Sequence, residues 1–140
     1  MAASVAIGCL TDISAAMSSK PECLYHFTCK HSKRDIGTSN CLLIPMIRHP
    51  FLGCKVLWLT SEAQADREAT GLRMHHQRCD RMEFRYVVTD IDGCQPWLTS
   101  VERAAAPPSA VEDLESYGDA EHWWISDKPI RARFDRSWMP

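Results

Sequence analysis

The feature that most constrains this chain is a series of short apolar runs, rich in aromatic residues and separated by prolines, glycines or charged residues. The four clearest runs are LYHFT (24–28), KVLWLT (55–60), EFRYVV (83–88) and WWIS (123–126). Aromatic and β-branched residues in short runs between such breakers are typical of strands. No apolar stretch comes near the roughly 20 residues that span a bilayer. The sequence therefore predicts a sheet of short strands and no membrane-spanning helix.

The segments between these runs have room only for short helices. The basic segment 31–36 ends at Gly37, which is a common helix stop. Ser61 is a good N-cap residue followed by an acidic residue, and Gly71 limits the helix that would start there. A further helix is predicted over residues 109–117, opened by a capping serine. Short helices among short strands indicate a mixed α+β fold.

The composition fits one ordinary globular domain. The chain has 140 residues, of which 45% are hydrophobic and 24% charged. Residues 1–20 carry little charge and many small side chains, and we expect a flexible N-terminal extension there. Residues 21–140 hold all the strand-like runs without a repeat or a linker, and are expected to form a single domain. The turn signal Asp92-Gly93 follows a run of alternating polarity, which favours antiparallel pairing.

The seven cysteines show neither the even number nor the regular spacing of a disulfide framework. We therefore expect free thiols in a reducing cytoplasm. Two groupings come closest to zinc-ligand spacing: Cys23-x5-Cys29-x-His31 and His75-His76-x2-Cys79. Neither has the closely paired ligands of a structural zinc site, so no bound metal is predicted. Cys29 could act as a nucleophile with a nearby histidine, but no local motif singles it out.

The charge balance argues against indiscriminate nucleic-acid binding, because the net charge is -2 and the pI is about 6.3. No glycine-rich phosphate-binding motif occurs. The C-terminal segment combines Arg131, Arg133 and Arg136 with Phe134 and Trp138. Arginines and aromatic rings can bind single-stranded nucleic acid, but an edge strand protected by charge is the favoured interpretation.

The order of three motifs resembles the ADP-ribosyltransferase-like group. The first strand reads L-Y-H-F-T and the second V-L-W-L-T-S, while Glu121 precedes the late strand W-W-I-S. Small members of that group begin with L-Y-H-[FY]-T, and their second strand commonly reads V-[YWF]-[LF]-[TS]. The resemblance implies a split, mostly antiparallel sheet with short flanking helices. It also implies NAD as a substrate, with ADP-ribose transferred to a macromolecule or NAD cleaved.

The same resemblance suggests roles for individual residues. Cleavage of the nicotinamide–ribose bond passes through an oxocarbenium-like cation, which a nearby carboxylate stabilises. Glu121 is the best match for that carboxylate, with Asp119 and His122 as rival candidates. The remaining roles fall to residues of the first two strands: His26 and Thr28 would hold the adenosine-side ribose, Trp58 would stack on the nicotinamide, and Thr60 with Ser61 would shape the site.

A longer stretch, from Leu24 to about Trp138, is similar to a small group of actinobacterial and phage proteins. The shared phrases are V-x-W-L-T, C-D-R-x-x-x-R-Y-V-V and H-W-W-[IV]-S. This similarity implies a phage-encoded protein that acts on a host protein in the host cytoplasm, with nucleic acid left open as an acceptor. The alternative is a binding protein without catalysis, which sequesters a nucleotide or docks on a host protein. In that case the aromatic residues of the strands simply fill the core.

Overall fold

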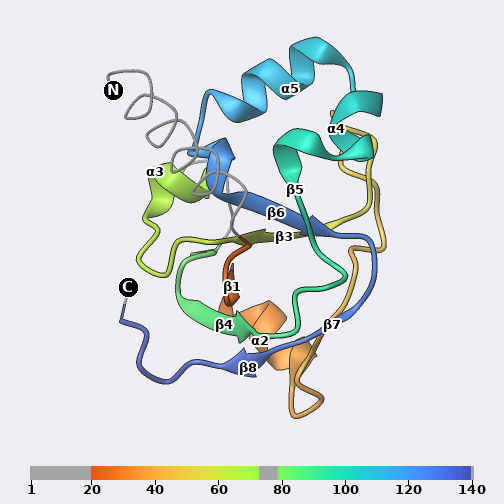
Figure 1. The fold of residues 1–140 in the computed structure, drawn as a ribbon. Coiled ribbons are helices and arrows are strands. Elements are labelled where there is room, and N and C mark those ends of the chain that lie inside the picture. Colours follow the sequence, from red (N-terminus) through yellow and green to blue (C-terminus); the bar gives the residue numbers. More distant parts are fainter. Residues whose placement is uncertain (1–19, 73–78, 140) are drawn as a thin grey trace, which may run out of the picture.

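The computed structural model describes residues 20–72 and 79–139 (Figure 1). The four aromatic runs form strands, as predicted: β1 (Leu24–Thr28), β3 (Leu57–Thr60), β4 (Phe84–Val88) and β6 (Trp123–Ser126). With the short strands β5 (Gln95–Pro96) and β8 (Arg133–Phe134) they form a six-stranded sheet of order β5-β6-β3-β1-β4-β8. Neighbouring strands in this sheet are antiparallel. The fold is thus a small mixed α+β domain with a mostly antiparallel sheet, which confirms the predicted class at that level.

The C-terminal segment forms edge strands, as its alternating pattern indicated. β8 extends the main sheet beside β4, with Phe134 opposite Tyr86. Just before it, β7 (Ile130–Arg131) pairs with β2 (Cys41–Leu42) in a separate two-stranded sheet. The C-terminal segment therefore pairs with both β2 and β4, which are distant from each other in the sequence.

The first helix agrees with the sequence prediction at its end, whereas the next helix differs from it at its start. α2 (Lys30–Ile36) ends at Gly37 as expected, with a φ of 55°. α3 (Arg67–Thr70) is not capped by Ser61: Asp66 accepts a hydrogen bond from the Ala69 amide at 2.8 Å. The Ser61 prediction was wrong because this residue continues the extended pairing with the segment before β6.

The later helices lie in the segment that links β5 to β6. The helical turn η2 (Trp97–Thr99) leads into α4 (Val101–Ala105), followed by α5 (Pro108–Glu115). The predicted serine cap of α5 was wrong, since the helix begins one residue earlier at a proline, whose fixed φ suits the first helical position. A second turn, η3 (Ala120–His122), leads directly into β6.

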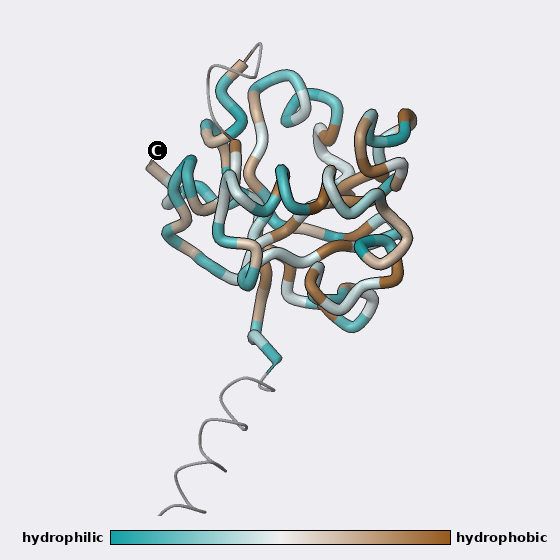
Figure 2. The backbone as a smooth tube through the Cα atoms, turned by 90° about the horizontal axis from the view of Figure 1, so that it is seen from above, coloured by the Kyte–Doolittle hydropathy of each residue, from teal (hydrophilic) through white to brown (hydrophobic). Residues whose placement is uncertain are grey.

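The sheet separates two packed layers: α3 and α5 pack against core residues of one layer and α2 against those of the other. In Figure 1, α4 and α5 lie at the top near β5 and β6, and α2 lies beside β4 and β8. Side chains alternate between the faces, and residues directly opposite one another share a face. Tyr25 lies opposite Thr60, and Thr60 lies opposite Trp123, so these three share the face toward α3–α5. Hydrophobic segments concentrate along the central strands (Figure 2).

Three tryptophans form the centre of the layer under α4 and α5. The Trp58 ring centroid lies 4.8 Å from that of Trp97 and 6.0 Å from that of Trp123. Trp97 is fully buried, and its indole nitrogen donates to the Glu115 carboxylate at 3.0 Å. Buried aromatic side chains of this size dominate the packing energy of a small core.

Across residues 20–72 and 79–139, no helix has the length and apolar character needed to cross a membrane. The expected N-terminal extension, residues 1–20, lies outside the described residues except for Lys20.

Candidate functional site

The C-terminal end of β3 meets the N-terminal end of β6 at a polar corner of the sheet. Thr60 is opposite Trp123, and one step further the Ser61 amide donates to the His122 carbonyl at 3.0 Å. This register brings the Ser61 hydroxyl to 3.0 Å from His122 Nδ1. Residues separated by about half of the chain therefore meet because two antiparallel strands continue for one more pair.

Three carboxylates surround the other nitrogen of the His122 ring. His122 Nε2 lies 3.3 Å from a Glu62 oxygen, and 3.8 Å from oxygens of both Asp119 and Glu121. Within the described part of the chain, no lysine or arginine forms an ion pair with these three carboxylates. We call Ser61, Glu62, Asp119, Glu121 and His122 the acidic corner.

Local packing fixes the acidic corner from both sides. The Thr60 hydroxyl accepts a hydrogen bond from the Glu62 amide at 3.1 Å, and the Asp119 amide donates to the Ala69 carbonyl at 2.8 Å. Gly118 permits this second contact. A Cβ at Gly118 would lie 2.4 Å from the Trp123 ring and 2.8 Å from the Ala69 carbonyl oxygen. Only glycine fits there without displacing η3 from α3.

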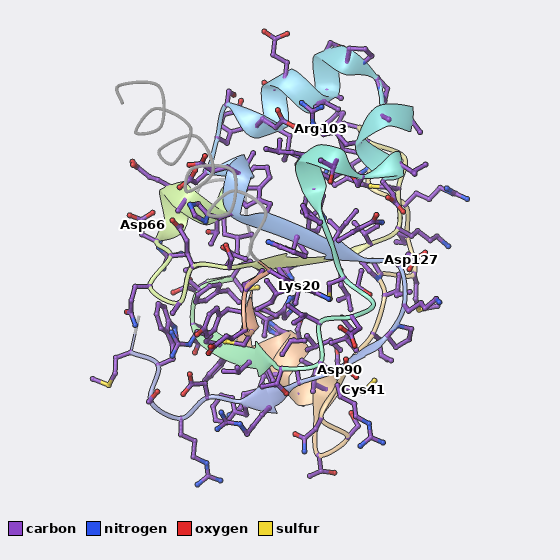
Figure 3. The ribbon with its side chains drawn as sticks, in the orientation of Figure 1. Lys20, Cys41, Asp66, Asp90, Arg103 and Asp127 are labelled. Carbon is purple, nitrogen blue, oxygen red and sulfur yellow. The ribbon has the colours of Figure 1, made fainter. Side chains whose placement is uncertain are left out.

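The surroundings of the acidic corner shift the pKa of Glu62 upward. Burial raises the pKa of Glu62; the neighbouring His122 lowers it, while Asp119 and Asp66 raise it further. Asp66 is labelled in Figure 3 at the start of α3, on the same side of the molecule. A half-buried carboxyl group whose pKa is raised in this way is better suited to accept and return protons than an ordinary surface glutamate.

His26, predicted to hold a ribose, has a defined ring orientation. Its Nδ1 lies 2.9 Å from the main-chain oxygen of Trp58. Because a carbonyl only accepts, Nδ1 donates, and burial lowers the pKa of His26, which favours the neutral ring. In that tautomer Nε2 is an acceptor for a hydroxyl group.

The predicted residues of β1 and β3 do not converge on one cleft. Strand alternation places His26 and Thr28 on the face opposite to the side chains of Trp58 and Thr60. The Trp58 ring packs against the tryptophans of the core, and Thr60 is buried with its hydroxyl bonded to the Glu62 amide. The structure instead brings Ser61 and the three candidates for the late site, Asp119, Glu121 and His122, into contact.

Glu62 is the residue of this corner that sequence reasoning missed. It was assigned to the first turn of a helix, because Ser61 resembles an N-cap residue. The signal that points to it is its place directly after the V-L-W-L-T-S strand, at the end that faces the late acid. A strand end next to a second strand end is where side chains from distant segments meet.

A basic groove of about 400 Å³ lies between α2 and the β4–β8 edge. Lys30, Lys33 and Arg34 line one side, and the Lys33 ammonium nitrogen sits 4.6 Å and 4.4 Å from the ring centroids of Phe84 and Phe134. The three cations occupy i, i+3 and i+4 positions, which share one face of a helix. That spacing is visible in the sequence, although the overall charge balance conceals it.

The fold also brings together members of both groupings that were considered for zinc. Ligand atoms of Cys29, His31 and Cys79 all lie within 4.8 Å of one another. Each grouping contributes part of the cluster, so neither has a complete set of ligands by itself. His75 and His76 lie outside the described residues.

No protein-family model matches the chain, and no curated protein or solved structure resembles it closely enough to count as a match.

Proposed function

We propose that this protein uses NAD as a substrate and cleaves its nicotinamide–ribose bond at the acidic corner, with transfer of ADP-ribose to a macromolecule or to water. The observation that carries the proposal is the meeting of Ser61 at the end of β3 with Glu121 and His122 before β6. The ADP-ribosyltransferase-like resemblance requires these same segments to share a site. It assigns them from sequence order alone, so their contact supports it independently.

The charge of the corner fits the chemistry of this bond. The nicotinamide ring of NAD is a cation, and the cleavage passes a positive charge to the ribose. When the carbon–nitrogen bond breaks, its electron pair stays on nicotinamide, which leaves as a neutral molecule. Carboxylates without a lysine or arginine partner can stabilise such a positive charge.

The corner separates two chemical roles. The Glu121 side chain is 72% exposed, so a bound ligand reaches it first, and we assign it to the developing cation. Behind it, the Ser61 hydroxyl is hydrogen-bonded to His122, and His122 Nε2 lies 3.3 Å from the Glu62 carboxylate. The acceptor's nucleophilic atom bonds to the ribose carbon and releases its proton, which passes to the Glu62 carboxylate directly or through His122.

We assign the rest of the dinucleotide to the β4 side of β1, across the sheet from β3 and the acidic corner. His26 lies opposite Tyr86, which lines the basic groove, and by the same alternation it shares a face with Ser61. Neighbouring strands are about 4.8 Å apart, so β3 and β4 are on the order of 10 Å apart across the sheet, and Ser61 is also offset from Tyr86 along the strands. The lysines and arginine of α2 suit the pyrophosphate, and His26 Nε2 suits a ribose hydroxyl. Trp58, with core partners, has no part in this assignment.

Serine nucleophilic catalysis is a poorer fit to the same residues. The order Ser61–His122–Glu62 resembles a catalytic triad, but acyl transfer also needs donors for an oxyanion. The amides of Ser61 and Glu62 are both engaged, with the His122 carbonyl and the Thr60 hydroxyl. These two donors are therefore not available to an oxyanion.

A divalent cation is the second candidate ligand of the corner. Ligand atoms of Glu62, Asp119 and His122 lie within 4.8 Å of one another, and two carboxylates with one imidazole suit Mn²⁺ or Mg²⁺. Titration of the protein with Mn²⁺ in the presence and absence of NAD separates the two candidates. Under the NAD proposal, NAD binds in the absence of Mn²⁺, and Mn²⁺ itself does not bind tightly to the acidic corner.

Thermal unfolding in the presence of NAD tests the proposal. A ligand that binds only the folded state at 100 times its Kd stabilises it by about 2.7 kcal/mol, so millimolar NAD should raise Tm. Lys33→Glu in the groove should weaken that shift, whereas Lys55→Glu, at an exposed position away from the groove, should not. Absence of any shift at millimolar NAD contradicts the proposal. A shift without nicotinamide release would favour the non-catalytic binding protein.

A further inference from the structure

We propose that Cys29, His31 and Cys79 bind one Zn²⁺ ion at a site that joins the start of α2 to the segment before β4. This inference is independent of the NAD proposal, because it concerns different residues and a different metal chemistry. It rests on the distances between three ligand atoms from two separate parts of the chain.

The spacing of the ligand atoms matches a tetrahedral zinc ion. With Zn–S near 2.3 Å and Zn–N near 2.0 Å, neighbouring ligand atoms lie about 3.5–3.8 Å apart. Cys29 Sγ is already 3.9 Å from His31 Nδ1, and all three ligand atoms lie within 4.8 Å of one another. Binding therefore requires shifts of at most about 1 Å in side chains, two of which are at least partly exposed.

Antiparallel pairing explains why these residues meet. Thr28 lies opposite Phe84, so the residues just after β1 and just before β4 leave the sheet together. Cys29 follows β1 directly and has a buried side chain, while Asp80 caps a tight turn between Cys79 and β4 by accepting from the Met82 amide at 2.9 Å. His31 sits in the first turn of α2, two residues after Cys29.

The donor set selects zinc over the hard cations. Two thiolates and an imidazole are soft or intermediate ligands, which bind Zn²⁺ well and Mg²⁺ or Ca²⁺ poorly. Three protein ligands leave the fourth position of the tetrahedron to solvent or to another group.

Metal binding would link two segments of the domain that are distant in sequence. Cys29 and Cys79 are 50 positions apart in the sequence, so a shared ion closes a long loop. A metal that binds only the folded chain adds its binding free energy to folding. The other chemistry available to two nearby cysteines is a disulfide, for which His31 would have no role.

Titration of the reduced full-length protein with Co²⁺ tests the site, with Zn²⁺ as competitor. We expect one equivalent to bind and to give a near-ultraviolet thiolate-to-cobalt band together with the visible bands of tetrahedral Co²⁺, all removed by Zn²⁺. Even changes outside the ligand shell cost roughly 10–100-fold in metal affinity, so Cys79→Ser should cost at least about 100-fold. His31→Ala should shift the visible bands, and because His31 is exposed this variant should fold normally.

Two controls keep the outcome specific. Cys41→Ser alters a partly exposed cysteine of β2, paired with β7 (Figure 3), and should leave Co²⁺ binding unchanged. Glu62→Gln in the acidic corner should also leave the thiolate band unchanged. Failure to bind Co²⁺, binding without a thiolate band, or an unchanged spectrum in Cys79→Ser would overturn the proposal. A Cys29–Cys79 disulfide that persists in mild reductant would overturn it in favour of a redox pair.

Discussion

Two charged regions of this domain are built in opposite ways. The first is the ion pair of Arg85 in β4 and Asp135 after β8, whose side chains are only 8% and 13% exposed. The second is the acidic corner, where carboxylates surround His122 and are 30–72% exposed. In the ion pair each charge has a partner of opposite sign; in the corner like charges gather around one titratable ring.

The surroundings of Arg85 show how completely a structural charge is satisfied here. Its guanidinium donates to Asp135 and to the Ala63 carbonyl, and lies 5.0 Å and 4.8 Å from the rings of Tyr25 and Trp138. The acidic corner has no such compensation within the described residues, and the pKa of Glu62 is raised rather than lowered. Uncompensated like charges reduce stability, so their presence favours a ligand or a reaction as their purpose.

The largest effect is expected from breaking the ion pair. In Asp135→Asn the buried Arg85 charge loses its partner, and the loss of one member of a buried pair costs about 3–5 kcal/mol. Urea denaturation should therefore show a much lower free energy of unfolding. Asp92→Asn is the matched control, because Asp92 pairs with Lys20 at a side-chain exposure of 91% and such pairs contribute little. Equal effects of the two substitutions would contradict the distinction between the regions.

A smaller loss is expected where the corner is held against α3. Gly118→Ala places a Cβ against the Trp123 ring and the Ala69 carbonyl, and such overpacking costs about 1–3 kcal/mol. Gly93→Ala is the control, since a Cβ at Gly93 meets nothing within 4 Å. The two variants can be compared by thermal unfolding. If Gly118→Ala were as stable as Gly93→Ala, the packing that positions Asp119 would be wrong.

The smallest effect should have the opposite sign. Glu62→Gln removes one of several crowded negative charges and should increase the free energy of unfolding at neutral pH by about 0.5–1 kcal/mol. The sign follows from the raised pKa of Glu62: its advantage to the folded state exists at low pH and is lost as pH rises through the folded pKa. The gain should therefore disappear below about pH 4, where the carboxyl is protonated. Destabilisation at neutral pH would assign Glu62 to structure.

Acid unfolding sharpens the same contrast. The Ser137 hydroxyl and Arg85 lower the pKa of Asp135 to about 2, below its ordinary value. A lowered pKa means that this contribution to stability is present at neutral pH and is lost as pH falls from about 4 toward 2. In Asp135→Asn the dependence of stability on pH should flatten in that window, as measured by urea denaturation across pH. An unchanged dependence would mean that Asp135 is not held by its partners.

The sequence predicted the elements well where local pattern decides them. The four aromatic runs form strands and Gly37 ends a helix, because burial and backbone conformation act within a few residues. Ser61 was misassigned as an N-cap because its partner, His122, lies 61 positions away in the sequence. The same limit applies to Cys29 and Cys79, whose proximity depends on the register of β1 against β4. Sequence patterns do not reveal a side chain's partner when that partner comes from another strand.

Strand alternation explains why His26 and Trp58 do not face one cleft. The local sequence pattern places Trp58 on a strand, but it does not show the face of the sheet on which the Trp58 ring packs. That face is fixed by the register of Tyr25 against Thr60, which a single sequence does not specify. The three candidates for the late acid lie together because all of them precede β6, whose first residue is opposite the end of β3.

Release of nicotinamide from NAD tests the central claim most directly. Wild-type protein should release nicotinamide from NAD faster than the uncatalysed reaction does, as measured by chromatography. Glu121→Gln should lower the rate about 100-fold or more, the scale of a lost charge-stabilising group, while retaining the NAD-induced rise in Tm. Glu112→Gln, at an exposed position on α5, should release nicotinamide like wild type. Equal rates in Glu121→Gln and wild type, or no release by either, would contradict the assignment of the acidic corner.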